Sequence, residues 1–223
     1  MDLKNYPNND KMDIFQRIPC AVIHREQDKE RMPLIQALER DLDRPLQIFE
    51  ALDGRALANT GFPTRHPLPG EKITPGVIGC VASHIELIES AFKESYEFVC
   101  IFEDDAEVVG DLEEYLACVA KLPKADIICF GTNEIVDGEL TADPSILKIR
   151  RFWGTHAIMI TRKAMHALLM TYHDGIKNGI LYPADWLYNT AIKNYSLLAY
   201  APFRSIIKQK PGLVSSINGK TRV

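Results

Sequence analysis

The sequence contains no apolar run of the about 20 residues that a membrane-spanning helix requires. Residues 1–16 are polar and carry no apolar signal region, so we expect a mobile arm ahead of a folded domain over 17–210. Residues 211–223 have the composition of a polar tail. These features predict a cytoplasmic protein without a transmembrane segment, for which peripheral contact with a membrane stays open.

The chain also lacks an excess of positive charge. Its 26 Lys and Arg residues stand against 30 Asp and Glu residues, for a formal net charge of −4. No overall field therefore attracts a polyanion, and we expect no nucleic-acid partner.

The cysteines lack the CxxC spacing that is typical of zinc sites, and their number is odd. The five are Cys20, Cys80, Cys100, Cys118 and Cys129. A disulfide framework and a structural zinc site thus have little support in the sequence. We interpret these residues as small, mostly buried side chains in a reduced compartment.

What is present is an alternation of short apolar segments and segments of helical period. Strands are predicted at 17–24, 46–52, 98–102, 125–131, 154–161 and 196–202, and helices at 28–42, 76–95, 111–122, 162–172 and 183–194. This order predicts a single α/β domain with a mostly parallel central sheet flanked by helices. Residues 55–75 hold four prolines and two glycines, which predicts a long loop of the kind that often carries function.

Three consecutive acids, Glu103, Asp104 and Asp105, follow the predicted strand 98–102 directly. In open α/β sheets, ligands bind beyond the carboxyl ends of strands. Alternation along the chain would point Glu103 and Asp105 in one direction, where their charges repel unless a cation or a shared proton intervenes. Mg²⁺ or Mn²⁺ fits oxygen ligands of this kind, with Asp105 as the first ligand expected and Glu103 as its partner. The alternative is a solvated loop whose acids cap helix 111–122.

Three other enzyme classes use related acids and fit less well. Phosphatases with an aspartyl nucleophile need a hydroxyl residue after Asp-x-Asp, which "EDDAEVVG" lacks. Adjacent carboxylates cannot straddle a glycosidic bond as a glycoside hydrolase requires. A nucleotidyltransferase would need a Gly-rich phosphate loop near the first strand, and "VIHREQDKE" contains no glycine.

Five segments in this order resemble glycosyltransferase family 25, which includes lipooligosaccharide and collagen galactosyltransferases. They are "FEALDGR" (49–55), "GVIGCVASHIELIESA" (76–91), "YEFVCIFEDDAEV" (96–108), "FWGTHAIMITRKAMHALL" (152–169) and "PADWLY" (183–188). The resemblance implies a GT-A-like, Rossmann-related fold and a UDP-sugar donor, often UDP-galactose. It also implies a divalent metal at the Glu-Asp-Asp cluster and transfer with inversion, as in lipopolysaccharide or other glycan biosynthesis. The acceptor stays open between a saccharide, a lipid-linked saccharide and a protein.

The resemblance assigns donor contacts to seven residues: Asp53, Gly54, Ser83, His84, Asp104, Thr155 and His156. Each also has a purely structural interpretation. Asp53 and Gly54 could form a plain turn, and a helical His84 beside apolar neighbours could be a packed core residue. Thr155 and His156 could equally belong to a core strand.

Asp185 is the predicted catalytic base, because it lies in the Pro-x-Asp-Trp pattern and an inverting transferase needs a carboxylate near the acceptor hydroxyl. A carboxylate in the first turn of a helix is also favoured without any catalytic role. Where family members usually carry Ile-Asn-Leu at the end of the first strand, this chain has "VIHRE". A catalytically silent module that binds a nucleotide sugar or a partner is therefore the alternative function.

Overall fold

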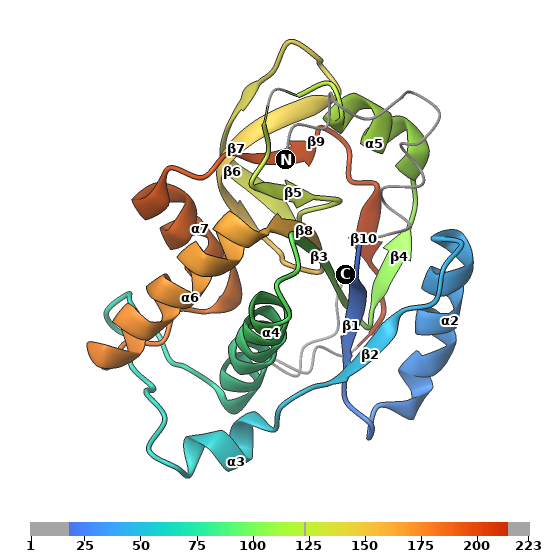
Figure 1. Cartoon of the computed structure of the whole chain (residues 1–223). Coiled ribbons are helices and arrows are strands. Elements are labelled where there is room, and N and C mark those ends of the chain that lie inside the picture. Colours follow the sequence, from blue (N-terminus) through green and yellow to red (C-terminus); the bar gives the residue numbers. More distant parts are fainter. Residues whose placement is uncertain (1–17, 123, 214–223) are drawn as a thin grey trace.

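A central sheet of eight strands organises the chain in the computed structural model, which describes residues 18–122 and 124–213 (Figure 1). In sheet order the strands are β2 (Gln47–Glu50), β1 (Cys20–His24), β3 (Phe98–Glu103), β8 (Ala157–Thr161), β5 (Ile127–Cys129), β9 (Ala199–Pro202), β7 (Ile146–Trp153) and β6 (Glu134–Leu140). Strands β2, β1, β3, β5 and β9 run in the same direction. The predicted single α/β domain with a mostly parallel sheet is confirmed.

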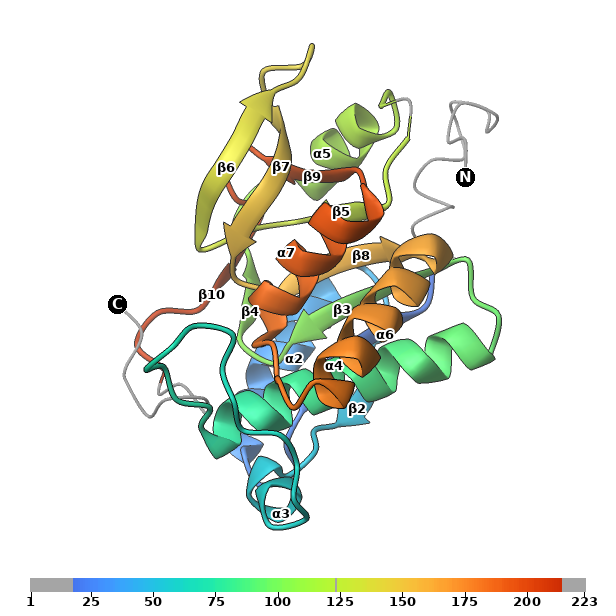
Figure 2. The ribbon, with the colours of Figure 1, turned by 90° about the vertical axis from the view of Figure 1, so that its left-hand side faces the viewer.

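Helices cover both faces of this sheet. Helices α4 (Pro75–Lys93), α6 (Arg162–Lys177) and α7 (Ala184–Tyr195) lie on one face, as Figure 2 shows from their side. Helices α2 (Met32–Asp41) and α5 (Leu112–Val119) pack on the other. Strand β3 supplies both cores, because Val99 and Ile101 point to the first face and Cys100 and Phe102 to the second.

Short elements complete the described chain. They are the 3-10 helix η2 (Lys29–Arg31), helix α3 (Gly54–Ala58) and a separate two-stranded sheet of β4 (Ala106–Val108) and β10 (Ile207–Gln209). The predicted loop 55–75 therefore begins in helix α3, and its remainder is tied down through Arg65, which bridges to Lys72 and Ile180. The hairpin of β6 and β7 and the β4–β10 pair were not predicted.

The helix starts follow local hydrogen-bonding chemistry. Thr161, the N-cap of α6, accepts a hydrogen bond from the backbone N–H of Ala164, and Thr74 does the same for Val77 in α4. No helix of the described residues combines the length and apolar character needed to cross a membrane. The expected mobile arm 1–16 and most of the polar tail, 214–223, lie outside the described residues.

Candidate functional site

A cleft of about 800 Å³ opens where β1, β2 and β3 end. Its walls come from residues 25–31 after β1, residues 50–55 after β2, the first turns of α4, and the acids at the end of β3. The ends of these elements lie together in the lower half of Figure 1. This is the edge of the sheet at which α/β proteins bind ligands.

Carboxylates dominate the wall of this cleft. Eight of its residues are acidic: Glu26, Asp28, Glu30, Glu50, Asp53, Glu103, Asp104 and Asp105. The three guanidinium groups in the lining belong to Arg25, Arg31 and Arg55, and Arg25 is bound to Asp28 at 2.7 and 2.8 Å. An anionic ligand such as a diphosphate would enter against this charge, so a cation that accompanies it would lower the repulsion.

Asp104 is held by two cationic or ionisable side chains from distant parts of the chain. His24 Nδ1 lies 2.8 Å from Asp104 Oδ2, and Arg31 Nη1 donates to Asp104 Oδ1. The same Arg31 nitrogen lies 3.6 Å from Asp105 Oδ2. Burial alone would lower the pKa of Arg31, but Asp104, Asp105 and Asp28 outweigh it and raise this pKa above its ordinary value. The positive charge of Arg31 therefore offsets much of the electrostatic repulsion between Asp104 and Asp105.

Glu103 has different surroundings. Thr155 Oγ1 donates to its Oε1 and Gln209 Nε2 to its Oε2, each at 3.0 Å. His84 Nε2 lies 3.8 Å from the same Oε1. Donor atoms of Cys80, His84 and Glu103 all lie within 4.8 Å of one another. Neutral groups thus hold Glu103 in place, while guanidinium and imidazole groups hold Asp104.

The Mg²⁺ or Mn²⁺ that the resemblance implies can be tested against these contacts. Hard divalent ions prefer oxygen ligands. Glu103 and Asp105 both line the cleft and carry carboxylate oxygens, whereas both oxygens of Asp104 are bound by His24 and Arg31. The residues fit an ion at Glu103 and Asp105, and Asp104 fits a structural anchor better than a ligand.

Ser83 fastens the end of β2 to α4. Its Oγ donates to the Gly79 carbonyl at 2.6 Å and accepts from the Leu52 N–H at 2.9 Å. Asp53, which follows Leu52, caps α3 by accepting a hydrogen bond from the Arg55 N–H at 2.8 Å. Ser83 therefore positions the turn that carries Asp53 and Gly54 along the cleft.

Gly54 and Gly79 let the starts of α3 and α4 approach closely. A Cβ on Gly54 would lie 1.8 Å from the Pro75 carbonyl oxygen and 2.5 Å from the Gly79 nitrogen, both backbone atoms. We expect Gly54→Ala to lower the free energy of unfolding by about 1–3 kcal/mol, as overpacking does elsewhere. Urea unfolding would measure this. Ala56→Ser, on the exposed side of α3, is the control and should shift stability by less than about 0.5 kcal/mol. Equal stability of the two variants would contradict the close contact.

Asp185, Thr155 and His156 are not among the described residues that line the cleft. Thr155 donates a hydrogen bond to Glu103, which lines the cleft. His156 is fully buried, and its Nε2 lies 3.0 Å from the Ile207 carbonyl. Asp185 lies in the first turn of α7 and accepts from the Trp186 N–H at 3.2 Å. Burial raises the pKa of Asp185, and the charge of Glu103 raises it further, against the backbone hydrogen bonds that lower it.

Aromatic rings gather around Trp186, the residue that follows Asp185. The Trp186 ring lies 5.8 Å from the Trp153 ring and 5.8 Å from the imidazole of His66 in the long loop. All three side chains are half-buried. A surface of this kind suits the apolar face of a sugar ring.

The structure thus brings most of the predicted site residues together and leaves some apart. Asp53, Gly54, Ser83, His84, Glu103, Asp104 and Asp105 line the cleft. Sequence reasoning missed Arg31, Cys80 and Gln209. The proximity of Cys80 and His84 could have been predicted from the sequence, because residues four apart on a helix share a face.

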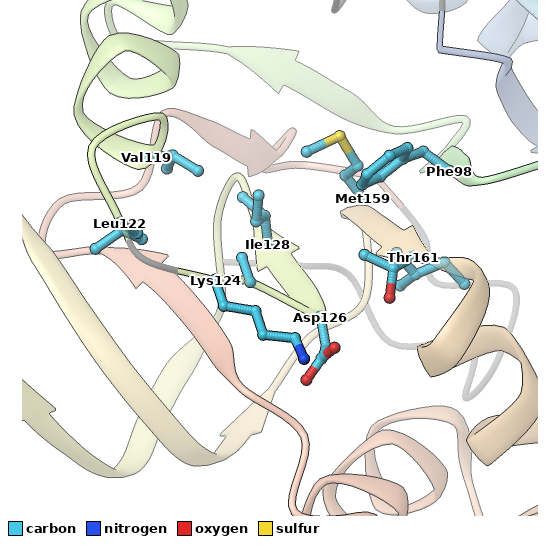
Figure 3. A pocket seen from close by; sticks show the side chains of 10 residues that line it. Phe98, Val119, Leu122, Lys124, Asp126, Ile128, Met159 and Thr161 are labelled. Atoms are coloured by element: carbon cyan, nitrogen blue, oxygen red, sulfur yellow. The ribbon is translucent and has the colours of Figure 1, made fainter. Parts of the chain in front are cut away.

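Figure 3 shows a different, much narrower pocket at the amino ends of β3 and β5. Phe98 and Met159 line one side of it, and Asp126 is its acid. Asp126 is already bound by Lys163 Nζ and by the Leu198 N–H, each at 2.9 Å. This pocket lies away from the acid cluster, which is at the opposite ends of the strands, and the partners of Asp126 give this acid a structural role.

Comparison with known proteins adds one family. Residues 18–187 match the model described as glycosyltransferase family 25 (LPS biosynthesis protein). The curated proteins contain no match to the chain.

Three solved structures are similar to this chain at low sequence identity. A197 from STIV is 10% identical, with a TM-score of 0.47 and coverage of 92% of this chain and 95% of that one. A glycosyltransferase involved in the glycosylation of the major capsid of PBCV-1 is 11% identical, with a TM-score of 0.41 and coverage of 81% and 75%. CTP:phosphocholine cytidylyltransferase from Streptococcus pneumoniae is 8% identical, with a TM-score of 0.41 and coverage of 93% and 79%.

Proposed function

The chain belongs to glycosyltransferase family 25, and we propose that it moves a hexose, galactose before others, from a UDP-sugar to an acceptor hydroxyl with inversion. The observation that carries the proposal is the carboxylate-lined cleft at the ends of β1, β2 and β3. Its size, about 800 Å³, suits a nucleotide sugar, since ligand pockets commonly measure about 300–1,000 Å³.

We place the donor along the wall formed by the end of β2 and the start of α4. Asp53 and Gly54 would contact its nucleoside, and Ser83 would hold that wall in position through Leu52. His84 and Asp104 line the inner part of the cleft, where the diphosphate would lie near the acids. Thr155 and His156 would support the site without touching the donor. Thr155 would orient Glu103, and His156 would anchor the chain near Ile207.

Glu103 and Asp105 are the residues that would hold a Mn²⁺ or Mg²⁺ ion beside the diphosphate. When bound, such an ion supplies positive charge that stabilises the departing UDP. Thr155 and Gln209 keep the Glu103 carboxylate oriented by a hydrogen bond to each oxygen. Arg31 binds Asp104, whereas Glu103 lies close to His84 and Cys80.

Asp185 is the proposed general base. It would take the proton from the acceptor hydroxyl as that oxygen attacks the anomeric carbon from the side opposite UDP. The new bond joins the acceptor oxygen to the anomeric carbon, and the bond from that carbon to the diphosphate oxygen breaks, so UDP leaves with the electron pair. The raised pKa of Asp185 makes it a stronger base than an ordinary aspartate. Trp186 and Trp153 would support the sugar ring of a saccharide or lipid-linked saccharide acceptor, although a protein acceptor fits the same chemistry.

We further propose a cytoplasmic location with at most peripheral membrane contact, as in lipopolysaccharide biosynthesis. The buried free thiols of Cys20, Cys100 and Cys129 support a reduced compartment.

A catalytically silent nucleotide-sugar- or partner-binding module of the same fold is the second candidate. The observation that favours it is the anchoring of Asp104 by His24 and Arg31, because the Arg31 charge compensates acids that would otherwise attract a metal ion. Such a module would bind the donor and leave it intact.

UDP release separates the two candidates. We expect the protein with UDP-galactose, Mn²⁺ and a panel of saccharide acceptors to release UDP, and EDTA to suppress the release. Asp105→Asn should reduce it strongly with the fold retained, as followed by circular dichroism. Donor binding in calorimetry without UDP release, on any acceptor and with any of several UDP-sugars, would favour the silent module and contradict the transferase.

A further inference from the structure

The proposed reaction does not explain why Cys80 lies close to both His84 and Glu103. Cys80 and His84 lie one turn apart on α4, so both side chains project from the same face of that helix. This face meets the end of β3, where Glu103 points toward them at 3.8 Å from His84 Nε2. Within residues 18–122 and 124–213, no other three Cys, His, Asp or Glu side chains bring their donor atoms this close together.

His84 supplies an independent observation that points to a ligand. Its side chain is 1% exposed, and neither ring nitrogen has a hydrogen-bond partner among the described residues. The Tyr188 ring packs edge-on against the imidazole, with the ring centroids 6.1 Å apart, and offers it no hydrogen bond. A buried polar group without a hydrogen bond costs about 1–3 kcal/mol, so its retention calls for an explanation.

The directions of the three donors distinguish a metal site from a nucleophilic triad. In a Cys-His-Glu relay, the thiol and the carboxylate contact opposite nitrogens of the imidazole ring. Here the sulfur, a carboxylate oxygen and a single ring nitrogen all approach one another within 4.8 Å. Donor atoms around a tetrahedral zinc ion lie about 3.5 Å apart, given bond lengths of about 2.0–2.3 Å, so small side-chain rotations close the site.

From this geometry we infer that Cys80, His84 and Glu103 bind a borderline transition-metal ion of the zinc class. Sulfur and nitrogen donors select such ions over Mg²⁺, which prefers oxygen alone. All three residues line the cleft, so an ion can enter from solvent, and three protein ligands leave a fourth position open to water or a substrate oxygen. The site shares Glu103 and His84 with the proposed donor site, but it does not depend on sugar transfer.

Cobalt spectroscopy on the full chain tests the inference without any activity measurement. After EDTA treatment and removal of the chelator, added Co²⁺ should give a thiolate-to-cobalt charge-transfer band, and Zn²⁺ should abolish it. Cys80→Ser should remove the band, and His84→Gln should weaken Zn²⁺ binding by about a hundredfold or more, since losing even an outer-shell partner costs about 10–100-fold.

Cys118→Ser is the matched control, because Cys118 is a half-buried thiol on α5 outside the cluster. It should leave the cobalt band unchanged. Circular dichroism of Cys80→Ser must show a folded protein, and His84→Gln, which retains the thiol, provides the second test if it does not. Absence of the band in the unaltered chain, its survival in Cys80→Ser, or displacement of cobalt by an equal concentration of Mg²⁺ would each overturn the site.

Discussion

Asp185→Asn should lower the rate of sugar transfer by about 10²–10⁴-fold while UDP-sugar binding stays near its original strength. The amide keeps the shape of the carboxylate, including an oxygen that can accept from the Trp186 N–H. It removes the ability to accept the proton of the acceptor hydroxyl. The measurement is kcat for UDP release on an active acceptor, together with donor affinity by calorimetry.

The pH profile gives a second readout of the same residue. The base acts only when deprotonated, so activity should fall as the pH drops through the pKa of Asp185. Burial and the charge of Glu103 raise this pKa, which places the acidic limb above the range of an ordinary aspartate. Asp185→Glu should retain part of the activity and an acidic limb. Asp174→Asn, an exposed aspartate on α6, is the control and should change neither rate nor profile. Unchanged turnover in Asp185→Asn would remove this residue as the base.

The apolar periodicity of the sequence predicts where strands and helices lie, and it does not predict how they pair. Strand β3 was predicted within a residue because an apolar run ends abruptly in acids. The direction of β8 was not encoded, since alternation looks the same in either direction, and β8 runs antiparallel between β3 and β5. The β6–β7 hairpin was missed because its exposed residues, such as Glu139 and Arg150, are charged and its apolar alternation is weak.

The same limit applies to the site. The acids at the end of β3 were visible in the sequence, but the partners of Asp104 lie 80 and 73 positions away, at His24 and Arg31. The segment "VIHRE" departs from the family pattern, and its histidine is one of the two residues that bind Asp104. A pairing across parallel strands leaves no local pattern, so only the folded chain shows that the three acids have different surroundings.

Arg31→Leu should be among the most destabilising substitutions in the chain. The Arg31 and Asp104 side chains are 7% and 9% exposed, so removing the guanidinium would leave a buried carboxylate with His24 as its remaining ionisable partner. Removing one partner of a buried ion pair lowers the free energy of unfolding by about 3–5 kcal/mol. Because the His24 contact is retained, we expect a loss of about 3 kcal/mol here. Urea unfolding monitored by circular dichroism would measure the loss in free energy of unfolding.

Arg25→Ala is the matched control, because Arg25 belongs to the same segment and pairs with Asp28 while its side chain is 36% exposed. Exposed pairs contribute about 0–1 kcal/mol, so this variant should remain close to the parent in stability. Combining Arg31→Leu with Asp104→Asn should recover part of the loss, since the uncompensated charge is then removed as well. If Arg31→Leu were no less stable than Arg25→Ala, the acids at the end of β3 would have to be compensated by something other than Arg31. A bound cation would then be the first alternative, and the stability of the unaltered protein should depend on added divalent metal.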